Sequence, residues 1–413
     1  MSAPHPLQPG PRPAWVRALN DSCDPRWISL DPDALLAEAQ RNTGLSDFGG
    51  DGFQQGLRVF LRAVEDEAQL HFVGRALTRG DVLNLLENRL RIADWRKRHP
   101  EIDAVRIEKP IFIMGLPRTG TSILHELLMQ DPAHRVPLHW EVRYPCPPPE
   151  SASFDSDPRI ERAHREIRLW TEIVPEYDRM HELGGALPVE CIFLTQHEFV
   201  SEQLAGTHQV PSYAAWLAQA DQRPAYGFHK RMLQLLSWRC PRERWVLKAP
   251  SHLTALDALV SVYPDARIVW THRDPLKVMG SVASILFATA WVRSDAVDGD
   301  KVLAWFDGAT CAALLDAATK LRDSGVVPAA QCADLLYRDL LRDPIGSIRA
   351  LYARFELPFT REAESRMRAY LAAKPQQKHG AHQYSFETTG ADRESERARF
   401  AAYQRRFGVP SEG

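Results

Sequence analysis

The chain has 413 residues, of which 44% are hydrophobic and 25% are charged, as in ordinary soluble globular proteins. Lys and Arg number 51 against 53 Asp and Glu, so the net charge of -2 argues against a globally basic nucleic-acid-binding protein. The six cysteines form no Cys-x-x-Cys pair, which argues against a disulfide scaffold or a zinc ribbon. No secretory signal is evident, and no apolar run approaches the ~20 residues of a membrane span, so we expect a cytoplasmic protein without an integral membrane segment.

Residues 1–108 divide into a proline-rich arm and a helical layer. Six prolines fall within the first 30 residues, which predicts an irregular arm there. From Asp31 to Arg98 apolar residues recur at helical spacing, as on the face that includes Leu57, Phe60 and Val64. We expect a helical layer that covers another part of the molecule.

An alternation of short apolar runs and helical segments begins at Pro110. The run Ile111–Met114 is closed by Gly115, which is typical of a strand buried on both faces of a parallel sheet. A helical pattern follows from Ser122 to Gln130. Three further strands, each followed by a helix, are predicted at residues 245–247, 268–270 and 333–337. The alternation predicts an α/β fold over residues 109–413, with a doubly wound parallel sheet flanked by helices.

Residues 145–240 interrupt this alternation with a mostly helical pattern. The insertion is longer than the usual connection between two parallel strands. Ligands of open α/β sheets bind outside the carboxyl ends of the strands. We therefore expect the insertion to form a helical cap over that edge of the sheet.

The loop after the first predicted strand has the composition of an anion-binding turn. From Gly115 to Ser122 it reads Gly-Leu-Pro-Arg-Thr-Gly-Thr-Ser. Backbone N–H groups in such a loop surround an anion, and the N-terminus of the following helix adds positive potential. A Walker A loop has lysine where Thr121 stands, so we expect a diphosphate-like ligand bound without reliance on magnesium. The residues expected to contact it are Arg118, which supplies charge, Thr119, Gly120, Thr121 and Ser122.

A second anion site is predicted at the end of strand 268–270. Arg273 follows this strand, and Ser281 lies eight residues later on the next helix. An arginine at this edge can hold a phosphate through two hydrogen bonds, and a serine hydroxyl can complete its surroundings. The alternative is a helix start at which Asp274 is the N-cap and Arg273 forms a salt bridge.

The two segments together resemble the sulfotransferases that use 3′-phosphoadenosine 5′-phosphosulfate (PAPS), a donor with anionic groups at both ends. The resemblance spans residues 109–390 and is greatest for the large bacterial branch related to tyrosylprotein sulfotransferases. It is carried by Gly115–Thr121, Trp140-Glu141, Lys248–His252 and Tyr337–Leu340. It implies a P-loop-type fold and an enzyme that uses PAPS and no metal. The acceptor group is a hydroxyl, or less favourably an amine, of an organic small molecule.

The resemblance also implies roles for individual residues. Arg118 and Lys248 would neutralise charge on the sulfuryl group and on the departing 5′-phosphate. Glu141 is the favoured base for the acceptor hydroxyl because of its position in the motif, and His252 is the alternative. If Glu141 is not the base, we expect a structural ion pair with Arg143.

Other features extend or limit the resemblance. Tyr337 would pack on the adenine, or else serve as a core aromatic at the end of a strand. The cytosolic sulfotransferases have a lysine in the first loop where Arg118 or Thr119 stands here. Their Arg-Lys-Gly segment has only a loose counterpart in Lys378-His379-Gly380.

Two other functions stay open at this point: a P-loop nucleotide kinase or other phosphotransferase, and a non-catalytic nucleotide-binding sensor or scaffold. The near-neutral charge predicts no nucleic-acid partner, and the oligomeric state, a homo-oligomer included, is left open. The acceptor pocket is not specified, because aromatic residues in such positions are more often part of a core. The aromatic candidates for its lining are Trp140, Trp170, Trp216, Trp238 and Phe193.

Overall fold

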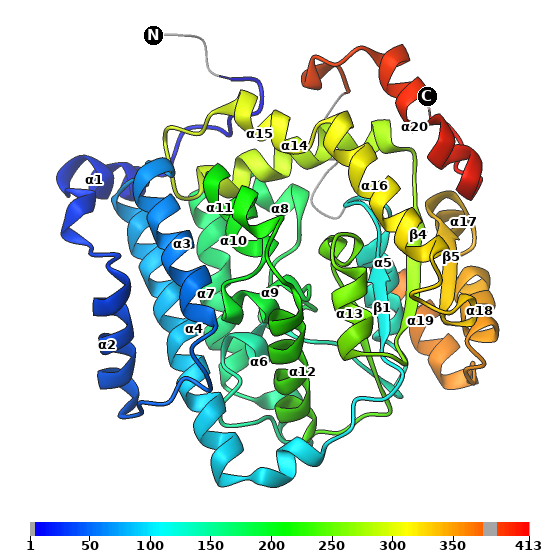
Figure 1. Ribbon diagram of the computed structural model, residues 1–413, viewed down its shortest axis with the longest axis horizontal. Coiled ribbons are helices and arrows are strands. Elements are labelled where there is room, and N and C mark those ends of the chain that lie inside the picture. Colours follow the sequence, from blue (N-terminus) through cyan, green and yellow to red (C-terminus); the bar gives the residue numbers. More distant parts are fainter. Residues whose placement is uncertain (1–4, 375–385, 413) are drawn as a thin grey trace.

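The computed structural model describes residues 5–374 and 386–412. At its centre lies a five-stranded parallel sheet with the strand order β2-β3-β1-β4-β5 (Figure 1). The strands are β1 (Ile111–Met114), β2 (His134–Arg135), β3 (Arg244–Lys248), β4 (Arg267–His272) and β5 (Cys332–Leu336). Four of them confirm the predicted strands. The fifth, β2, was not predicted, because an edge strand of two polar residues has no apolar pattern.

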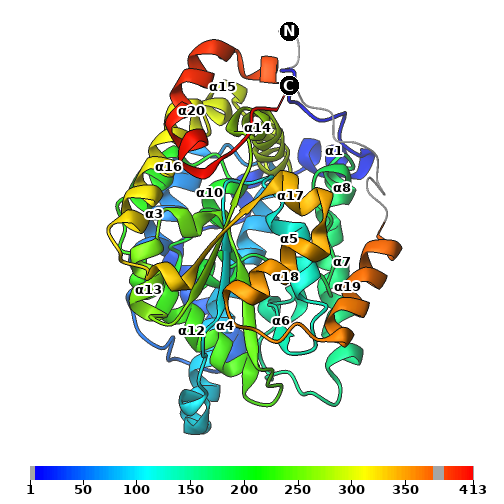
Figure 2. The ribbon, with the colours of Figure 1, turned by 90° about the vertical axis from the view of Figure 1, so that its right-hand side faces the viewer.

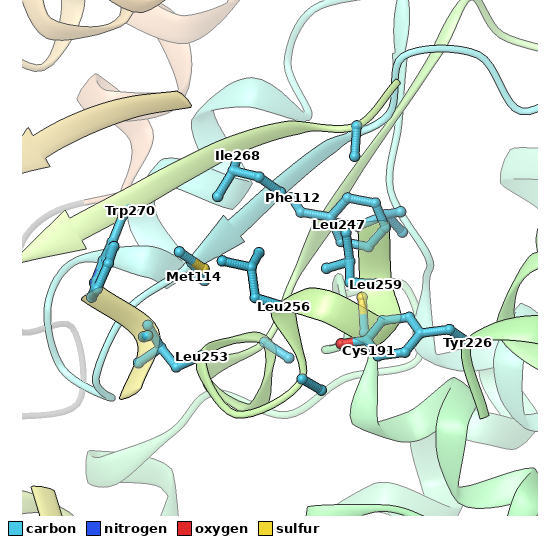
Figure 3. Close-up of a cluster of buried hydrophobic side chains, with 14 of the residues drawn as sticks. Phe112, Met114, Cys191, Tyr226, Leu247, Leu253, Leu256, Leu259, Ile268 and Trp270 are labelled. Carbon is cyan, nitrogen blue, oxygen red and sulfur yellow. The ribbon is translucent and has the colours of Figure 1, made fainter. Parts of the chain in front are cut away.

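The side chains of β1 alternate between two hydrophobic clusters, as those of a strand buried on both faces must. Phe112 and Met114 pack into one cluster, and Ile111 and Ile113 pack into the other. The first face is covered by α12 (Arg223–Ser237), α13 (Leu256–Val262), α16 (Gly308–Asp323) and α20 (Arg393–Phe407). The opposite face is covered by α5 (Thr121–Leu128), α18 (Pro344–Arg354) and α19 (Arg361–Ala373) (Figure 2). Figure 3 shows the first cluster, in which Leu247, Ile268 and Trp270 of the neighbouring strands join β1. The predicted P-loop-type α/β arrangement is confirmed.

The N-terminal layer is helical, as predicted, but it begins earlier than expected. Its helices are α1 (Ala14–Ser22), α2 (Pro32–Thr43), α3 (Phe53–Glu67) and α4 (Phe72–Arg98). The prediction of an irregular arm is therefore wrong for residues 14–22. The prolines of this region flank α1 instead of interrupting it: Pro13 is its N-cap and Pro25 begins the next 3-10 turn. Proline is tolerated at such positions because no intrahelical N–H is needed there.

The predicted insertion is helical and lies between the N-terminal helices and the sheet (Figure 1). Its helices are α7 (Arg159–Ile173), α8 (Tyr177–Met180), α9 (Ile192–Thr195), α10 (Glu202–Thr207) and α11 (Pro211–Leu217), followed by α12. One cluster joins Leu57 and Phe60 of α3 to Phe199 and Tyr213 of the insertion. The N-terminal layer and the cap therefore share a hydrophobic core, and the proposed boundary at residue 108 remains a prediction.

Four further helices complete the surroundings of the sheet edge. They are α6 (His139–Arg143), α14 (Pro275–Trp291), α15 (Gly299–Trp305) and α17 (Tyr337–Arg342). By length and composition alone, the described part of the chain has one stretch apolar enough to cross a membrane, Gly299–Asp323. The stretch includes charged residues such as Asp307 and Asp316, and the expectation of no integral membrane segment stays a prediction. The stretch forms two separate helices, α15 and α16, and Asp307 is the N-cap of the second.

Candidate functional site

The loop between β1 and α5 has the backbone of a tight anion-binding turn. Arg118 and Gly120 have φ angles of +67° and +89°. A Cβ atom on Gly120 would lie 2.9 Å from Cδ2 of Tyr337, so both the conformation and the available space favour glycine. Gly120 is the N-cap of α5, which places the unpaired N–H groups of the first turn next to the loop.

The threonines of this loop differ in what their side chains do. The Thr119 hydroxyl donates to the carbonyl of Leu116 at 2.7 Å and lies 2.6 Å from Oγ1 of Thr271. These bonds fix the loop to the end of β4, so the Thr119 side chain holds the loop in shape. Thr121 is buried at the start of α5, whereas Ser122 is exposed and lines a cavity.

Arg273 lies at the carboxyl end of β4, directly against the first loop. Its Nη1 donates to the carbonyl oxygen of Arg118 at 3.1 Å. Its guanidinium carbon lies 4.2 Å from the centre of the Tyr337 ring, and Tyr337 in turn packs on Gly120. Arg273 also forms a two-bond ion pair with Glu412 near the C-terminus. The structure therefore brings the end of β4, the end of β5 and the glycine turn together.

Ser281 lies about two turns along α14 from its start. The side chain is fully buried, and its hydroxyl has no hydrogen-bond partner within residues 5–374 and 386–412. Buried hydroxyls are rarely left without a partner, so this atom is a candidate for contact with a ligand. The start of α14 is as predicted, with Asp274 as the N-cap and Pro275 in the first turn. The predicted segment Lys378-His379-Gly380 lies outside the described residues.

Lys248 connects the loop to the cap. It ends β3, the neighbour of β1, and is only 3% exposed. Its Nζ lies 2.5 Å from Oε1 of Glu190 and 3.4 Å from Oγ of Ser122. The backbone N–H of Cys191 donates to the carbonyl of Lys248 at 2.8 Å, which fixes the cap segment against the strand end.

A cavity of about 540 Å³ opens between this ion pair and the cap. Its polar lining residues include Arg118, Ser122, His181 and Glu190, together with Glu202, Gln203 and Thr254. The remaining walls are mainly apolar, from Trp170, Phe193, Leu217, Val282, Leu286 and Phe306. Of the five aromatic residues predicted to line a pocket, Trp170 and Phe193 do so. Trp140, Trp216 and Trp238 pack in or against the hydrophobic clusters instead.

The cavity changes the protonation of two of its side chains. Desolvation by the surrounding protein lowers the pKa of His181 to about 4, and the charge of Lys248 adds to this effect. The imidazole is therefore neutral at pH 7. Desolvation also raises the pKa of Glu202 to about 7, and the negative charge of Glu190 acts in the same direction.

The structure does not bring Glu141 to the cavity. Its side chain is fully buried, Oε2 accepts from Nη2 of Arg135 at 2.5 Å, and Oε1 accepts from the N–H of Leu138 at 3.1 Å. Burial raises the pKa of this carboxyl, and the charge of Arg135 opposes the rise. Both oxygens are engaged in holding the polypeptide, so the geometry does not support Glu141 as the base. The expected ion pair exists, but with Arg135 in place of Arg143.

His252 does not line the cavity itself, but its neighbours Ser251 and Leu253 do. Its Nδ1 lies 2.6 Å from the hydroxyl of Tyr226, and its ring packs edge-on against Phe112. Burial lowers the pKa of His252 well below its usual value. His252 therefore lies directly behind the cavity wall, and its Nε2 has no hydrogen-bond partner within the described residues. Its role as the alternative base stays a prediction.

Sequence reasoning missed Glu190 and His181, the cavity side chains next to Lys248. Both lie in the insertion, which has no motif that we could read, and Glu190 is 58 residues from its partner. Only the fold brings them to the strand end. Within the described ranges, no three His, Cys, Asp or Glu side chains are arranged to hold a metal, and the expectation of metal-free chemistry stays a prediction.

Comparisons with known proteins agree with this arrangement. The sequence profile of the sulfotransferase family matches residues 110–361. An omega-hydroxy-beta-dihydromenaquinone-9 sulfotransferase, Stf3, of Mycobacterium bovis is 28% identical over 304 residues, which cover 69% of this chain and 72% of the relative.

Two solved structures are similar over almost their full length. The sulfotransferase STF1 of Mycobacterium tuberculosis H37Rv is 34% identical with a TM-score of 0.78, and the match covers 90% of this chain and 98% of that one. The sulfotransferase STF9 of Mycobacterium avium is 29% identical with a TM-score of 0.80, covering 92% and 97% of the two chains. These similarities favour a sulfotransferase over a nucleotide kinase or a non-catalytic scaffold. The chain belongs to the sulfotransferase family and is an enzyme of that class.

Proposed function

We propose that this sulfotransferase moves the sulfuryl group of PAPS to a hydroxyl group of an apolar small molecule. The observation that carries the proposal is the ion pair between Lys248 and Glu190. Its lysine reaches Ser122 at the start of α5, and its glutamate lines the apolar cavity under the cap. A donor at the loop and an acceptor in the cavity would therefore meet at this pair.

The residues at the sheet edge fit an adenosine donor with two anionic ends. The loop from Gly115 to Ser122 and the N-terminus of α5 would hold the 5′ end, and Tyr337 would pack on the base. Arg273 and Ser281 would hold the 3′-phosphate, because one supplies a charged pair of donors and the other a buried hydroxyl without a partner in the described chain. PAPS supplies the sulfuryl group, and no metal ion is required in this proposal.

Arg118 and Lys248 are proposed to stabilise negative charge during transfer. Two cations fixed by their surroundings are suited to this task, because charge that develops beside them needs no reorganisation of solvent. Arg118 is held by a bond from Nη1 to the carbonyl of Met180 at 3.2 Å, and Lys248 by its ion pair.

Glu190 is proposed as the base for the acceptor hydroxyl, in place of Glu141, and His252 stays the alternative. In the absence of ligands its carboxylate accepts from Lys248. When Lys248 turns toward the anionic oxygens of the donor, the carboxylate is released next to the cavity. It can then take the hydroxyl proton as the oxygen attacks the sulfur and the bond from sulfur to the 5′-phosphate oxygen breaks, which releases 3′,5′-adenosine bisphosphate.

The acceptor is proposed to be a hydroxylated molecule with a large apolar part. The walls of the cavity are mostly apolar, and Glu190, the partner of Lys248, is one of the polar residues among them. One relative is named for a sulfotransfer to omega-hydroxy-beta-dihydromenaquinone-9, which is consistent with a terminal hydroxyl on an apolar acceptor. An amine acceptor is the less favoured alternative. A cytoplasmic location and the absence of a nucleic-acid partner remain predictions.

The test combines transfer and binding. Labelled PAPS is supplied with a panel of apolar and polar alcohols, and wild type is compared with Glu190→Gln and with Glu202→Gln. The latter variant removes another cavity carboxyl that has no bond to Lys248. We expect Glu190→Gln to lower turnover at least 100-fold, a typical loss for an acid–base residue, with little change in the binding of 3′,5′-adenosine bisphosphate. Full turnover in this variant would exclude Glu190 as the base, and transfer to polar alcohols alone would exclude the proposed acceptor.

A further inference from the structure

Arg273, the residue proposed to hold the 3′-phosphate, is already bound to a carboxylate of the same chain. Its Nε donates to Oε1 of Glu412 at 2.9 Å, and its Nη2 donates to Oε2 at 2.9 Å. This is the parallel two-bond geometry by which a guanidinium recognises carboxylates and phosphates alike. The carboxylate of Glu412 therefore takes a position that an anionic ligand of Arg273 would use.

The segment that carries Glu412 is built into the fold. After α20 the chain turns at Gly408, and Val409 is buried in the cluster that covers one face of the sheet. The N–H of Glu412 donates to Oδ2 of Asp274 at 2.7 Å. Oδ1 of the same aspartate accepts from Arg397 of α20 at 2.7 Å. The N-cap of α14 thus anchors both α20 and the C-terminal segment beside Arg273.

We propose that the Glu412 carboxylate competes with the 3′-phosphate of the donor, so that donor binding displaces this autoinhibitory side chain from Arg273 while the buried Val409 keeps the segment anchored. This inference rests on the proposed donor site. A phosphate that took the Nε–Nη2 edge of Arg273 would have to remove the carboxylate. A phosphate that approached beside it would be repelled by the same negative charge. In either case, donor binding and the contact of Glu412 with Arg273 oppose each other.

The contact also connects the segment to the first loop. Nη1 of Arg273 donates to the carbonyl of Arg118, whose backbone has a positive φ. Release of Glu412 would leave Arg273 bound to the loop through this bond. The guanidinium of Arg273 would then contact both the 3′-phosphate of the donor and the loop that holds its 5′ end.

The test measures the affinity of two ligands that differ only in the 3′-phosphate. Binding of 3′,5′-adenosine bisphosphate and of adenosine 5′-monophosphate is measured by titration calorimetry for wild type, Glu412→Gln and Glu394→Gln. Glu394 is a matched control, because it is an exposed glutamate in the first turn of α20. The same titrations are made with Arg273→Gln and with the double variant, and thermal unfolding confirms that each protein is folded.

We expect Glu412→Gln to tighten the bisphosphate about two- to fivefold, as for a partly exposed ion pair, and to leave the monophosphate unchanged. Arg273→Gln should weaken the bisphosphate alone, and Glu412→Gln should then have no effect in its background. If Arg273→Gln weakens the bisphosphate but Glu412→Gln leaves it unchanged or weakens it, Glu412 is not a competitor, and the donor site stands. If Arg273→Gln affects neither ligand, the proposed 3′-phosphate site itself is wrong and the competition falls with it.

Discussion

The side of the site proposed for the donor and the side proposed for the acceptor are built in different ways. On the donor side, Arg118, Arg273 and Tyr337 lie within a few residues of the ends of β1, β4 and β5, and Ser122 and Ser281 lie on the helices that follow β1 and β4. On the acceptor side, the walls come from helices of the cap and from α14, which belong to several hydrophobic clusters. A rigid edge of the sheet thus faces a wall whose shape depends on how helices pack. Substitutions at the edge should affect every acceptor, whereas substitutions in the wall should depend on the acceptor used.

The largest expected effect is a loss of stability at Glu141, a residue that lies on neither the donor side nor the acceptor side. Glu141→Gln removes the charge that compensates the buried guanidinium of Arg135. Breaking a buried ion pair typically costs about 3–5 kcal/mol of unfolding free energy. We expect this loss in denaturant titrations, while the folded fraction keeps its turnover. Unchanged stability together with lost turnover would return Glu141 to the role of base.

Lys248→Ala removes the ion pair that joins the donor side to the acceptor side. Loss of one preorganised charge at a developing anion typically lowers turnover about 10²- to 10³-fold. We expect this loss with every acceptor tested, because Lys248 lies at the strand end and not in the cavity wall. Lys301→Ala, at a lysine whose side chain is 65% exposed, is the control. A loss confined to one acceptor would contradict the assignment of Lys248 to the donor side.

Gly120→Ala tests the shape of the loop. The substitution places a Cβ 2.9 Å from Tyr337 at a φ of +89°. A residue other than glycine at this positive φ should lower the free energy of unfolding by about 1–3 kcal/mol. We also expect it to weaken the binding of 3′,5′-adenosine bisphosphate. Gly227→Ala in α12, where no described atom beyond the adjacent backbone of the helix lies within 4 Å of the new Cβ, should instead be neutral or stabilising. If calorimetry gave Gly120→Ala and Gly227→Ala the same stability and the same affinity for the bisphosphate, the loop would not be tightly packed.

The smallest expected effect is a pH dependence on the acceptor side. The pKa of Glu202 is raised from 4.5 to about 7, so the folded protein holds a proton that the unfolded chain releases near pH 4.5. The stability contributed by this proton is fully present below about pH 4.5 and is lost as the pH rises through about 7. Glu202→Gln should therefore lose less stability between pH 5 and 8 than wild type, as measured by thermal unfolding. Parallel pH profiles would show that Glu202 is not desolvated.

The donor side could be predicted from sequence for a physical reason. An unbroken run such as Ile111–Met114 has to be covered on both faces, and a glycine such as Gly115 or Gly120 marks where the backbone turns sharply. These signals are local, so they identify the strand, the loop and the helix start together. Arg273 could be placed because the carboxyl ends of parallel strands meet at one edge.

The acceptor side could not be predicted, because its chemistry comes from long-range contacts. Glu190 has no local signal, and only the packing of the cap against β3 brings it to Lys248. Glu141 shows the opposite case, since a motif position alone favoured it as a base. Its partner Arg135 lies on β2, a strand too short to be recognised from the sequence, so the burial of the pair could not be predicted.

The most direct test of the account is a crystal structure with 3′,5′-adenosine bisphosphate. The account predicts the 5′-phosphate at the loop from Gly115 to Ser122, within reach of Lys248. It also predicts the 3′-phosphate at Arg273 and Ser281, with Glu412 displaced. A nucleotide bound with either phosphate elsewhere, or spanning the loop without contact to Arg273, would contradict it.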